Sequence, residues 1–185
     1  MPSRLRLRDA GAWRHLGFAL LFLTGCAGAP ETVRPPATSV SRDGVLHYQL
    51  PEGWFDATSD AQAAGHAVWL LSNDYAMSIT VDEVRLDRRA RADIGEDDLL
   101  RLSELVMSLV AADRSAQVTT RPAVRELNDA DYCTFSLVTE SGEKLLVAVM
   151  DTGERAYTVT FFCTSEDRAP GLIPVEEAFL GALRW

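Results

Sequence analysis

The chain has 185 residues, of which 47% are hydrophobic and 24% are charged, and its formal net charge is −9. A balance this acidic argues against nucleic-acid binding, because phosphate contacts require clustered lysine and arginine. It also disfavours a broad electrostatic attraction to anionic lipid.

The first 25 residues have the composition of a secretory leader. Arginines precede a short apolar run, and small residues follow it, which is the order found in signal peptides. The apolar run, residues 16–23, has only eight residues, whereas a membrane-spanning helix needs about 20. The sequence therefore predicts a signal peptide over residues 1–25 rather than an anchor helix.

The apolar run ends in Leu23, Thr24, Gly25 and Cys26. This tetrapeptide resembles the lipobox of bacterial lipoproteins. The resemblance implies cleavage between Gly25 and Cys26 and lipidation of Cys26 with acyl chains such as palmitate. An ordinary signal peptide with a small-residue cleavage site at 27–29 is the alternative. Since two acyl chains suffice for stable attachment, we expect an exported protein that contacts the membrane through the acyl chains on Cys26.

Residue 27 bears on the location that this resemblance implies. In Gram-negative lipoproteins an aspartate after the lipidated cysteine tends to retain the protein in the inner membrane, and this chain has Ala27 instead. We therefore expect the periplasmic leaflet of the outer membrane in a Gram-negative organism. In a single-membrane bacterium the same lipobox implies the outer face of the plasma membrane.

The remainder divides into a linker and one domain. Residues 26–43 contain small residues and Pro30, Pro35 and Pro36 without apolar periodicity, which is typical of a flexible tether. Residues 44–185 are long enough for a single core that buries about two-thirds of the unfolded surface. Without the leader, 14 basic and 26 acidic residues remain, and the net charge is −12.

The domain is predicted to contain seven strands and two helices. Apolar alternation bounded by turn residues predicts strands over residues 45–50, 66–72, 75–84, 117–126, 132–139, 145–151 and 156–163. Apolar residues at helical spacing predict a long helix over 96–112, and Pro174 marks the start of a last helix. Short turns predict that the last four strands form an antiparallel meander. Pro122 restricts the first of these strands to a sheet edge or a bulge.

These elements predict an α+β fold with an antiparallel sheet of about seven strands. The apolar run at 145–150 indicates a strand buried on both faces, which favours helices on both faces. The element order, with Leu50-Pro51-Glu52-Gly53-Trp54 and the closing Leu183-Arg184-Trp185, resembles the PsbP-like α/β/α sandwich. That fold includes a photosystem II extrinsic protein, a Ran-GTPase-binding family and bacterial lipoproteins. The resemblance implies binding or assembly, and it implies no catalytic residues.

Two cysteines remain besides Cys26. An exported protein sits where disulfides form, and Cys133 and Cys163 invite a bridge. However, if Thr139 pairs with Lys144, Cys133 lies opposite Met150. If Asp151 pairs with Glu154, Met150 lies opposite Arg155, and Cys163 lies eight residues, about 26 Å, beyond Arg155. A bridge requires Cα atoms within about 7 Å, so we expect two separate buried thiols. The same register predicts one common apolar face that contains Cys133, Phe135, Leu137, Leu146, Ala148, Met150, Tyr157, Val159, Phe161 and Cys163.

No catalytic motif stands out. The sequence lacks a Gly-x-Ser-x-Gly motif, a phosphate-binding glycine loop and a dinucleotide fingerprint. His47 and His66 lack the spacing of metal ligands. Four scattered carboxylates match no calcium loop; they are Asp56, Asp60, Asp74 and Asp82. We therefore expect no enzyme activity, no metal and no cofactor, although a Ser-His-Asp arrangement assembled from distant residues would leave no motif.

A basic cluster and three tryptophans complete the candidates. The cluster consists of Arg85, Arg88, Arg89 and Arg91. A solvated loop partly neutralised by nearby acids is favoured over a contact with lipid headgroups or an acidic partner. The tryptophans are Trp54, Trp69 and Trp185, and core packing is favoured over a ligand platform.

The leading functional hypothesis is a non-catalytic, lipid-anchored envelope protein with a monomeric domain. It would bind another envelope protein or assist envelope assembly. The alternative is a binder of small apolar or lipid-like ligands that uses a pocket between sheet and helix. A hydrolase would require a nucleophile and a base within hydrogen-bond reach in one cleft.

Overall fold

The computed structural model describes residues 38–185 except 87–88, 90, 92–93, 95–97 and 165. The described residues belong to one compact unit. The signal peptide, the cleavage site at Gly25 and Cys26, and the linker up to residue 37 lie outside the described residues.

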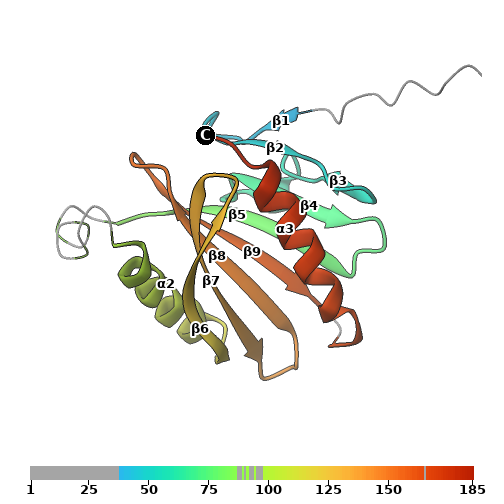
Figure 1. Cartoon of the computed structure of the whole chain (residues 1–185). Coiled ribbons are helices and arrows are strands. Elements are labelled where there is room, and N and C mark those ends of the chain that lie inside the picture. Colours follow the sequence, from blue (N-terminus) through green and yellow to red (C-terminus); the bar gives the residue numbers. More distant parts are fainter. Residues whose placement is uncertain (1–37, 87–88, 90, 92–93, 95–97, 165) are drawn as a thin grey trace, which may run out of the picture. The chain divides into compact units, whose positions relative to one another are not determined.

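A seven-stranded antiparallel sheet in the order β3-β4-β5-β9-β8-β7-β6 forms the centre of the domain (Figure 1). Its strands are β3 (Trp54–Asp56), β4 (Val68–Ser72), β5 (Met77–Val84), β6 (Ala116–Leu127), β7 (Ala130–Thr139), β8 (Lys144–Asp151) and β9 (Ala156–Cys163). A separate small sheet pairs β1 (Thr38–Val40) with β2 (His47–Gln49). The helices are α2 (Leu99–Asp113) and α3 (Leu172–Ala182), with short 3₁₀ helices η1 (Ala61–Ala63) and η2 (Glu166–Gly171).

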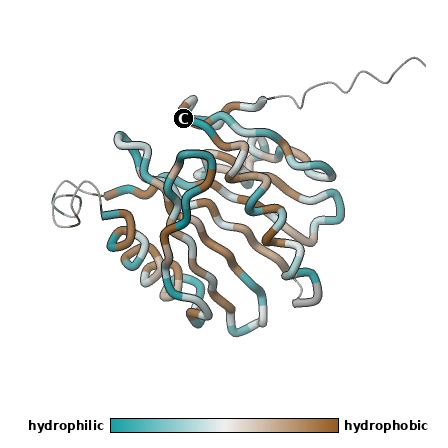
Figure 2. The backbone as a smooth tube through the Cα atoms, in the orientation of Figure 1, coloured by the Kyte–Doolittle hydropathy of each residue, from teal (hydrophilic) through white to brown (hydrophobic). Residues whose placement is uncertain are grey.

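Alternation along the strands divides the core between the two faces of the sheet. On one face α3 packs Phe179 against Phe161 of β9. On the other face α2 packs Leu102 and Val106 against β7 and β8. Hydrophobic residues accordingly follow the strands through the interior, and polar residues gather at the hairpin ends (Figure 2). The predicted α+β class, with helices on both faces of the sheet, is confirmed.

The first edge of the sheet differs from the prediction. The observed part of the first predicted strand, β2, pairs with β1 outside the large sheet, and β3 takes the edge position beside β4. Strand β1 lies inside the predicted linker, so residues 38–40 are part of a paired strand. The reason is length: three residues are too few to show an alternating pattern, and pairing with β2 orders them instead.

The β7–β8 register also differs, by one residue. Val138 pairs with Lys144, and Cys133 lies opposite Val149 rather than Met150. The turn explains this shift, because the Thr139 amide donates to the Glu143 carbonyl over 3.0 Å and closes the hairpin one residue earlier. A one-residue shift moves a strand's side chains to the other face.

The predicted common apolar face was therefore wrong for β7. Cys133, Phe135 and Leu137 lie on the α2 side, whereas Cys163 belongs to the core beneath α3. The β8–β9 pairing differs as well, since Asp151 lies opposite Ala156. Both cysteines are nevertheless buried and neither is in a disulfide, so the expectation of two separate thiols is confirmed.

The outer strand β6 carries Pro122 at the far edge of the sheet, as predicted. The β6–β7 register shifts twice near this proline, between Val118 and Thr120 and between Thr120 and Ala123. The other edge strand, β3, has only three residues. A proline, bulges and a short strand all hinder edge-to-edge pairing, so neither edge is a good template for an added strand.

Candidate functional site

Helix α2 covers only part of its side of the sheet. It packs chiefly on β6, β7 and β8, and the side chains that β3, β4, β5 and β9 place on the same side are half-buried. We call this region the open sheet face. Strand register places its residues in neighbouring rows; they are Phe55, Trp69, Leu71, Ser78, Thr80, Asp82, Thr158, Thr160 and Phe162.

The open sheet face results from alternation with a period of two residues. In β5, Ile79 and Val81 are fully buried in the core beneath α3, while Ser78 and Thr80, which alternate with them, point to the opposite side. Threonine has a high strand propensity and tolerates partial solvation. The face is consequently a mixture of hydroxyl, aliphatic and aromatic side chains, with the charged Asp82, paired with His66, at one end.

Aromatic contacts extend the open sheet face at two places. The Tyr75 ring, on the β4–β5 turn, packs edge-on against Phe55 with centroids 5.5 Å apart. The His66 ring lies 6.4 Å from the Trp69 ring. Aromatic side chains provide large contact areas with little entropy to lose, and they are frequent anchors of protein interfaces.

A groove of about 480 Å³ borders the open sheet face where β4 begins and β5 ends. In this groove the Nδ1 atom of His66 lies 2.6 Å from Oδ1 of Asp82, and both side chains are about one-third exposed. The sequence did not reveal this pair because its members are 16 residues apart. A carboxylate-oriented imidazole can act as a base. In the described part of the chain, however, the hydrogen bonds of His66 include no serine, threonine or cysteine.

Asp43 lies in the same groove and holds the β1–β2 loop against β9. It accepts hydrogen bonds from Ser41 Oγ at 2.5 Å and Tyr157 Oη at 2.7 Å, and Arg155 lies 3.3 Å away. Burial raises the pKa of the Asp43 carboxyl, but these hydrogen bonds, that of the Val45 amide and the Arg155 charge together outweigh it and lower the pKa. Burial and the bond to Asp43 raise the pKa of Tyr157 to about 12. Asp43 is therefore a structural anchor.

The remaining candidate carboxylates also have separate local partners. Asp56 accepts from Tyr48 Oη at 2.5 Å, and Asp60 caps η1 by accepting from the Gln62 amide. Asp74 forms an ion pair with Arg168. Hydrogen bonds lower the pKa of Asp74 to about 2, and the largest contribution is the bond from the Ser72 hydroxyl. Within the described ranges, no group of three or more His, Cys, Asp or Glu side chains is placed to hold a metal ion.

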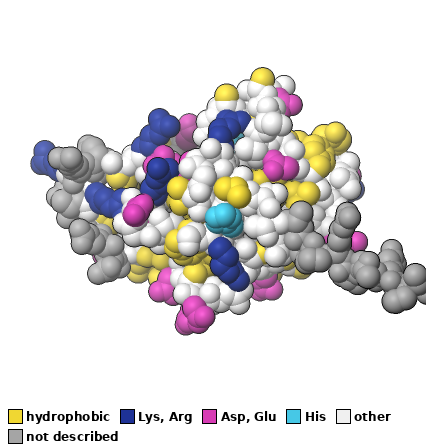
Figure 3. All heavy atoms as spheres, turned by 90° about the horizontal axis from the view of Figure 1, so that it is seen from above, with side chains coloured by type: hydrophobic (Ala, Val, Ile, Leu, Met, Phe, Trp, Pro, Cys, Tyr) yellow, Lys and Arg dark blue, Asp and Glu magenta, His cyan; other side chains and the backbone are white. Residues whose placement is uncertain are grey.

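The other predicted residues are dispersed. His47 is exposed and its backbone bonds to Arg184. Arg91 folds onto the β8–β9 hairpin, 3.4 Å from Asp151, whereas Arg85 and Arg89 are exposed; Arg88 lies outside the described residues. From above, acidic and basic side chains are interspersed and hydrophobic ones form separate patches (Figure 3).

The three tryptophans have different environments. Trp54 is 8% exposed and belongs to the core, as predicted. Trp69 lies on the open sheet face. Trp185 is 44% exposed and touches Tyr132 edge-on, so the expectation of core packing was wrong for Trp185. The alternation of Trp69 with buried Val68 and Leu70 is the signal that could have placed it on the outer side.

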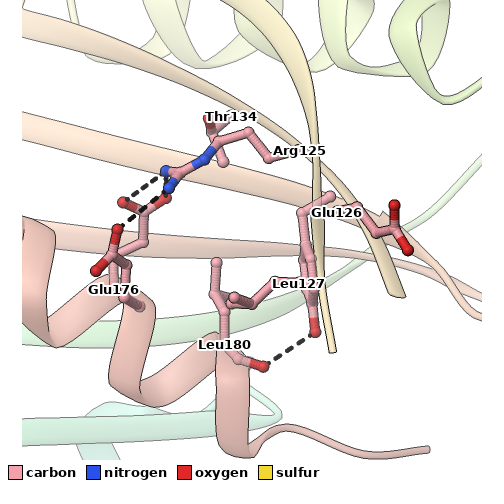
Figure 4. A pocket seen from close by; sticks show the side chains of 8 residues that line it. Arg125, Glu126, Leu127, Thr134, Glu176 and Leu180 are labelled. Atoms are coloured by element: carbon pink, nitrogen blue, oxygen red, sulfur yellow. Dashed lines mark hydrogen bonds and ion pairs between the residues drawn. The ribbon is translucent and has the colours of Figure 1, made fainter. Parts of the chain in front are cut away.

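The space between α3 and strands β6 and β7 is nearly filled (Figure 4). A pocket of about 20 Å³ remains there, which is room for a single water. The Arg125 guanidinium reaches across it to Glu176, with Nη1 3.3 Å from Oε1. Arg125 also contacts Glu177 at 3.3 Å. A lipid-like ligand does not fit at this position.

The domain has the PsbP-like fold: a seven-stranded antiparallel sheet with helices packed on both faces. The solution structure of cyanobacterial PsbP (CyanoP) from Synechocystis sp. PCC 6803 matches 86% of this chain and 99% of its own, with 16% identity and a TM-score of 0.53. A mutant form of the protein Mog1 matches 82% of this chain and 96% of its own, with 9% identity and a TM-score of 0.55.

At these identities the likenesses show the fold alone. No family model matches the sequence, and a search of curated proteins found no relative. Among the helices of the described residues, none is long and apolar enough to cross a membrane.

Proposed function

We propose that the chain is a non-catalytic, lipid-anchored envelope protein that binds a partner protein through the open sheet face. One observation carries the proposal: four strands leave a face of half-buried aromatic and hydroxyl side chains, uncharged across its centre, that α2 does not cover. Interfaces are depleted of charge and enriched in aromatic residues at their centres. Both edges of the large sheet are poor templates for an added strand, which favours a partner contact through a face of the sheet. The binding role of proteins with this fold agrees with the proposal by analogy.

Thr80→Arg tests the proposed contact, because Thr80 lies in the middle of the face between Trp69 and Thr160. A partner that covers residue 80 would have to accommodate and desolvate a guanidinium, and we expect its binding to weaken at least about tenfold. The measurement is recovery of the partner after crosslinking and affinity isolation, with circular dichroism as a check on folding. Val124→Arg is the matched control, since Val124 is an exposed strand residue, 53% accessible, on the β6 edge. Equal recovery with both variants would contradict the proposal.

Cys26→Ser tests the anchor. Acyl chains on Cys26 would supply the membrane affinity, since each buried methylene contributes about 0.8 kcal/mol and the protein's negative charge adds none. We expect the variant to leave the membrane fraction and to remain folded, as judged by membrane flotation and circular dichroism. Ala27→Ser, next to the cysteine, is the control and should still float with membranes. A Cys26→Ser chain that floats equally well would show that lipid is not the anchor.

A second candidate function is supported by one groove. About 260 Å³ is available between β7, β8 and the start of α3, with walls that include Leu146, Leu172 and Ile173. This volume lies just below the ~300–1,000 Å³ of typical small-molecule pockets. Binding of a small apolar ligand there is the alternative to partner binding.

A further inference from the structure

The dimensions of the open sheet face bear on the kind of partner that it fits. Its four strands span about 14 Å across, and the two-residue steps from Ser78 to Asp82 cover about 13 Å along β5. With the width of the side chains added, the face measures a few hundred square ångströms. A stable interface between two globular surfaces buries about 800 Å² on each partner. The face is too small for such an interface, and also for face-to-face dimerisation with a second copy of the chain.

The chemistry of the face also restricts the kind of partner surface that can bind to it. The rows across its centre hold three hydroxyl side chains, Ser78, Thr80 and Thr160, beside aliphatic and aromatic ones. These central rows hold no charged side chain, and the charged Asp82 lies opposite Thr158 at one end of the face, where it pairs with His66. A charged side chain placed on the central rows would lose water without gaining a counter-ion. The partner surface that complements the central rows is therefore uncharged.

The two sheet edges determine how a partner segment can contact the sheet. A peptide that joins a sheet as an extra strand needs a long, regular edge. Here β3 has three residues, and β6 carries Pro122 and two register shifts. An extended segment can still lie across the strands of the open face, where Trp69 and Phe162 provide anchors on either side of β5 and the hydroxyl groups provide hydrogen-bond partners.

We propose that the open sheet face binds an extended, uncharged segment of the partner protein, laid across strands β3, β4, β5 and β9. The inference rests on the proposed function, because it specifies which part of a partner occupies the same site. A single segment of about six residues is long enough to cross the face, since an extended chain advances about 3.3 Å per residue.

Photo-crosslinking tests this proposal in cells that produce the full chain. A photoreactive phenylalanine derivative replaces Thr80, or in a second variant Thr160, which guards against misfolding of the first. Val124 on the β6 edge is the control position. Crosslinked peptides are then mapped by mass spectrometry. We expect adducts from Thr80 and Thr160 to fall within one contiguous segment without charged residues, at a yield at least about tenfold above that from Val124.

Each other outcome has a definite meaning. Adducts from Thr80 that map to several separate segments of one protein would overturn the extended segment and leave the proposed function standing. A single segment rich in charged residues would overturn the uncharged partner surface. Equal yields from Thr80 and Val124, or adducts to sugar or lipid alone, would overturn the proposed function and this inference together.

Discussion

Phe179→Ala is expected to lower the free energy of unfolding by about 3–5 kcal/mol, as large-to-small substitutions of a buried phenylalanine do. Phe179 is fully buried on α3. Its ring lies 6.1 Å from Tyr48 of β2 and 6.1 Å from Phe161 of β9, and such aromatic pairs add about 0.5–1.5 kcal/mol each beyond area burial. The side chain therefore joins the small sheet to the large one, and its loss leaves a cavity between them.

Urea unfolding followed by tryptophan fluorescence measures this effect. Ile173→Ala is the matched control, because Ile173 is an apolar residue of the same helix that is 55% exposed. We expect the control to change stability by less than about 0.5 kcal/mol. Similar losses in the two variants would show that α3 is not anchored through Phe179.

Arg125→Met should destabilise the domain by about 2–3 kcal/mol at neutral pH, because it leaves the Glu176 carboxylate buried without its cation. Glu176 is 2% exposed, whereas Arg125 is 46% exposed, so the expected loss lies below that for a fully buried pair. Glu177→Gln is the control, because Glu177 is the exposed carboxylate that pairs with the same Arg125 guanidinium. This variant should change stability by less than about 0.5 kcal/mol.

The pH dependence gives an independent check on this ion pair. Burial raises the pKa of Glu176; the Arg125 charge opposes this effect and Glu177 adds to it. The native state therefore binds this proton more tightly than the unfolded chain does, and the contribution of Glu176 to stability rises as the pH falls from neutral through its folded pKa towards its ordinary value.

Comparison of the variants isolates this contribution. In Arg125→Met the gain on acidification should be larger and should begin at a higher pH, whereas Glu176→Gln should abolish it. Unfolding curves at several pH values measure both differences. If Arg125→Met and the native chain show parallel pH profiles, Arg125 does not stabilise the charged form of Glu176.

The alternation of apolar residues and the turn signals were sufficient to predict the meander, the long helix and the α+β class. They failed where hydrogen bonds in turns decide the register, as at Thr139 and Glu143, and where a strand has only three residues, as in β1 and β3. The open sheet face could be predicted from the sequence only in part. Ser78 and Thr80 alternate with Ile79 and Val81, which indicates a polar side of β5. Periodicity shows which side of a strand is polar, but it does not show how far a helix extends over that side.

The His66–Asp82 pair illustrates a different limit. Its members approach only because β4 and β5 pair side by side, and no spacing rule in the sequence brings residues 16 positions apart together. The resemblance to the PsbP-like fold predicted the architecture correctly. It contained no information on the site, because sites are particular side chains placed on a shared scaffold.

The placement of β1 has a mechanical consequence. A pull on the chain before Thr38 acts on the outermost pair of the small sheet, Thr38 with Gln49, and peels three pairs one after another. Peeling would release about 10 Å of chain at ~3.3 Å per residue. It would then meet Ser41 and Arg42, whose amides donate to the Leu46 and Ala67 carbonyls. Asp43 follows, held to β9 by Tyr157 and Arg155. Strand β1 would thus yield first to a pull on the residues before Thr38, and the large sheet would bear load only after β1 has yielded.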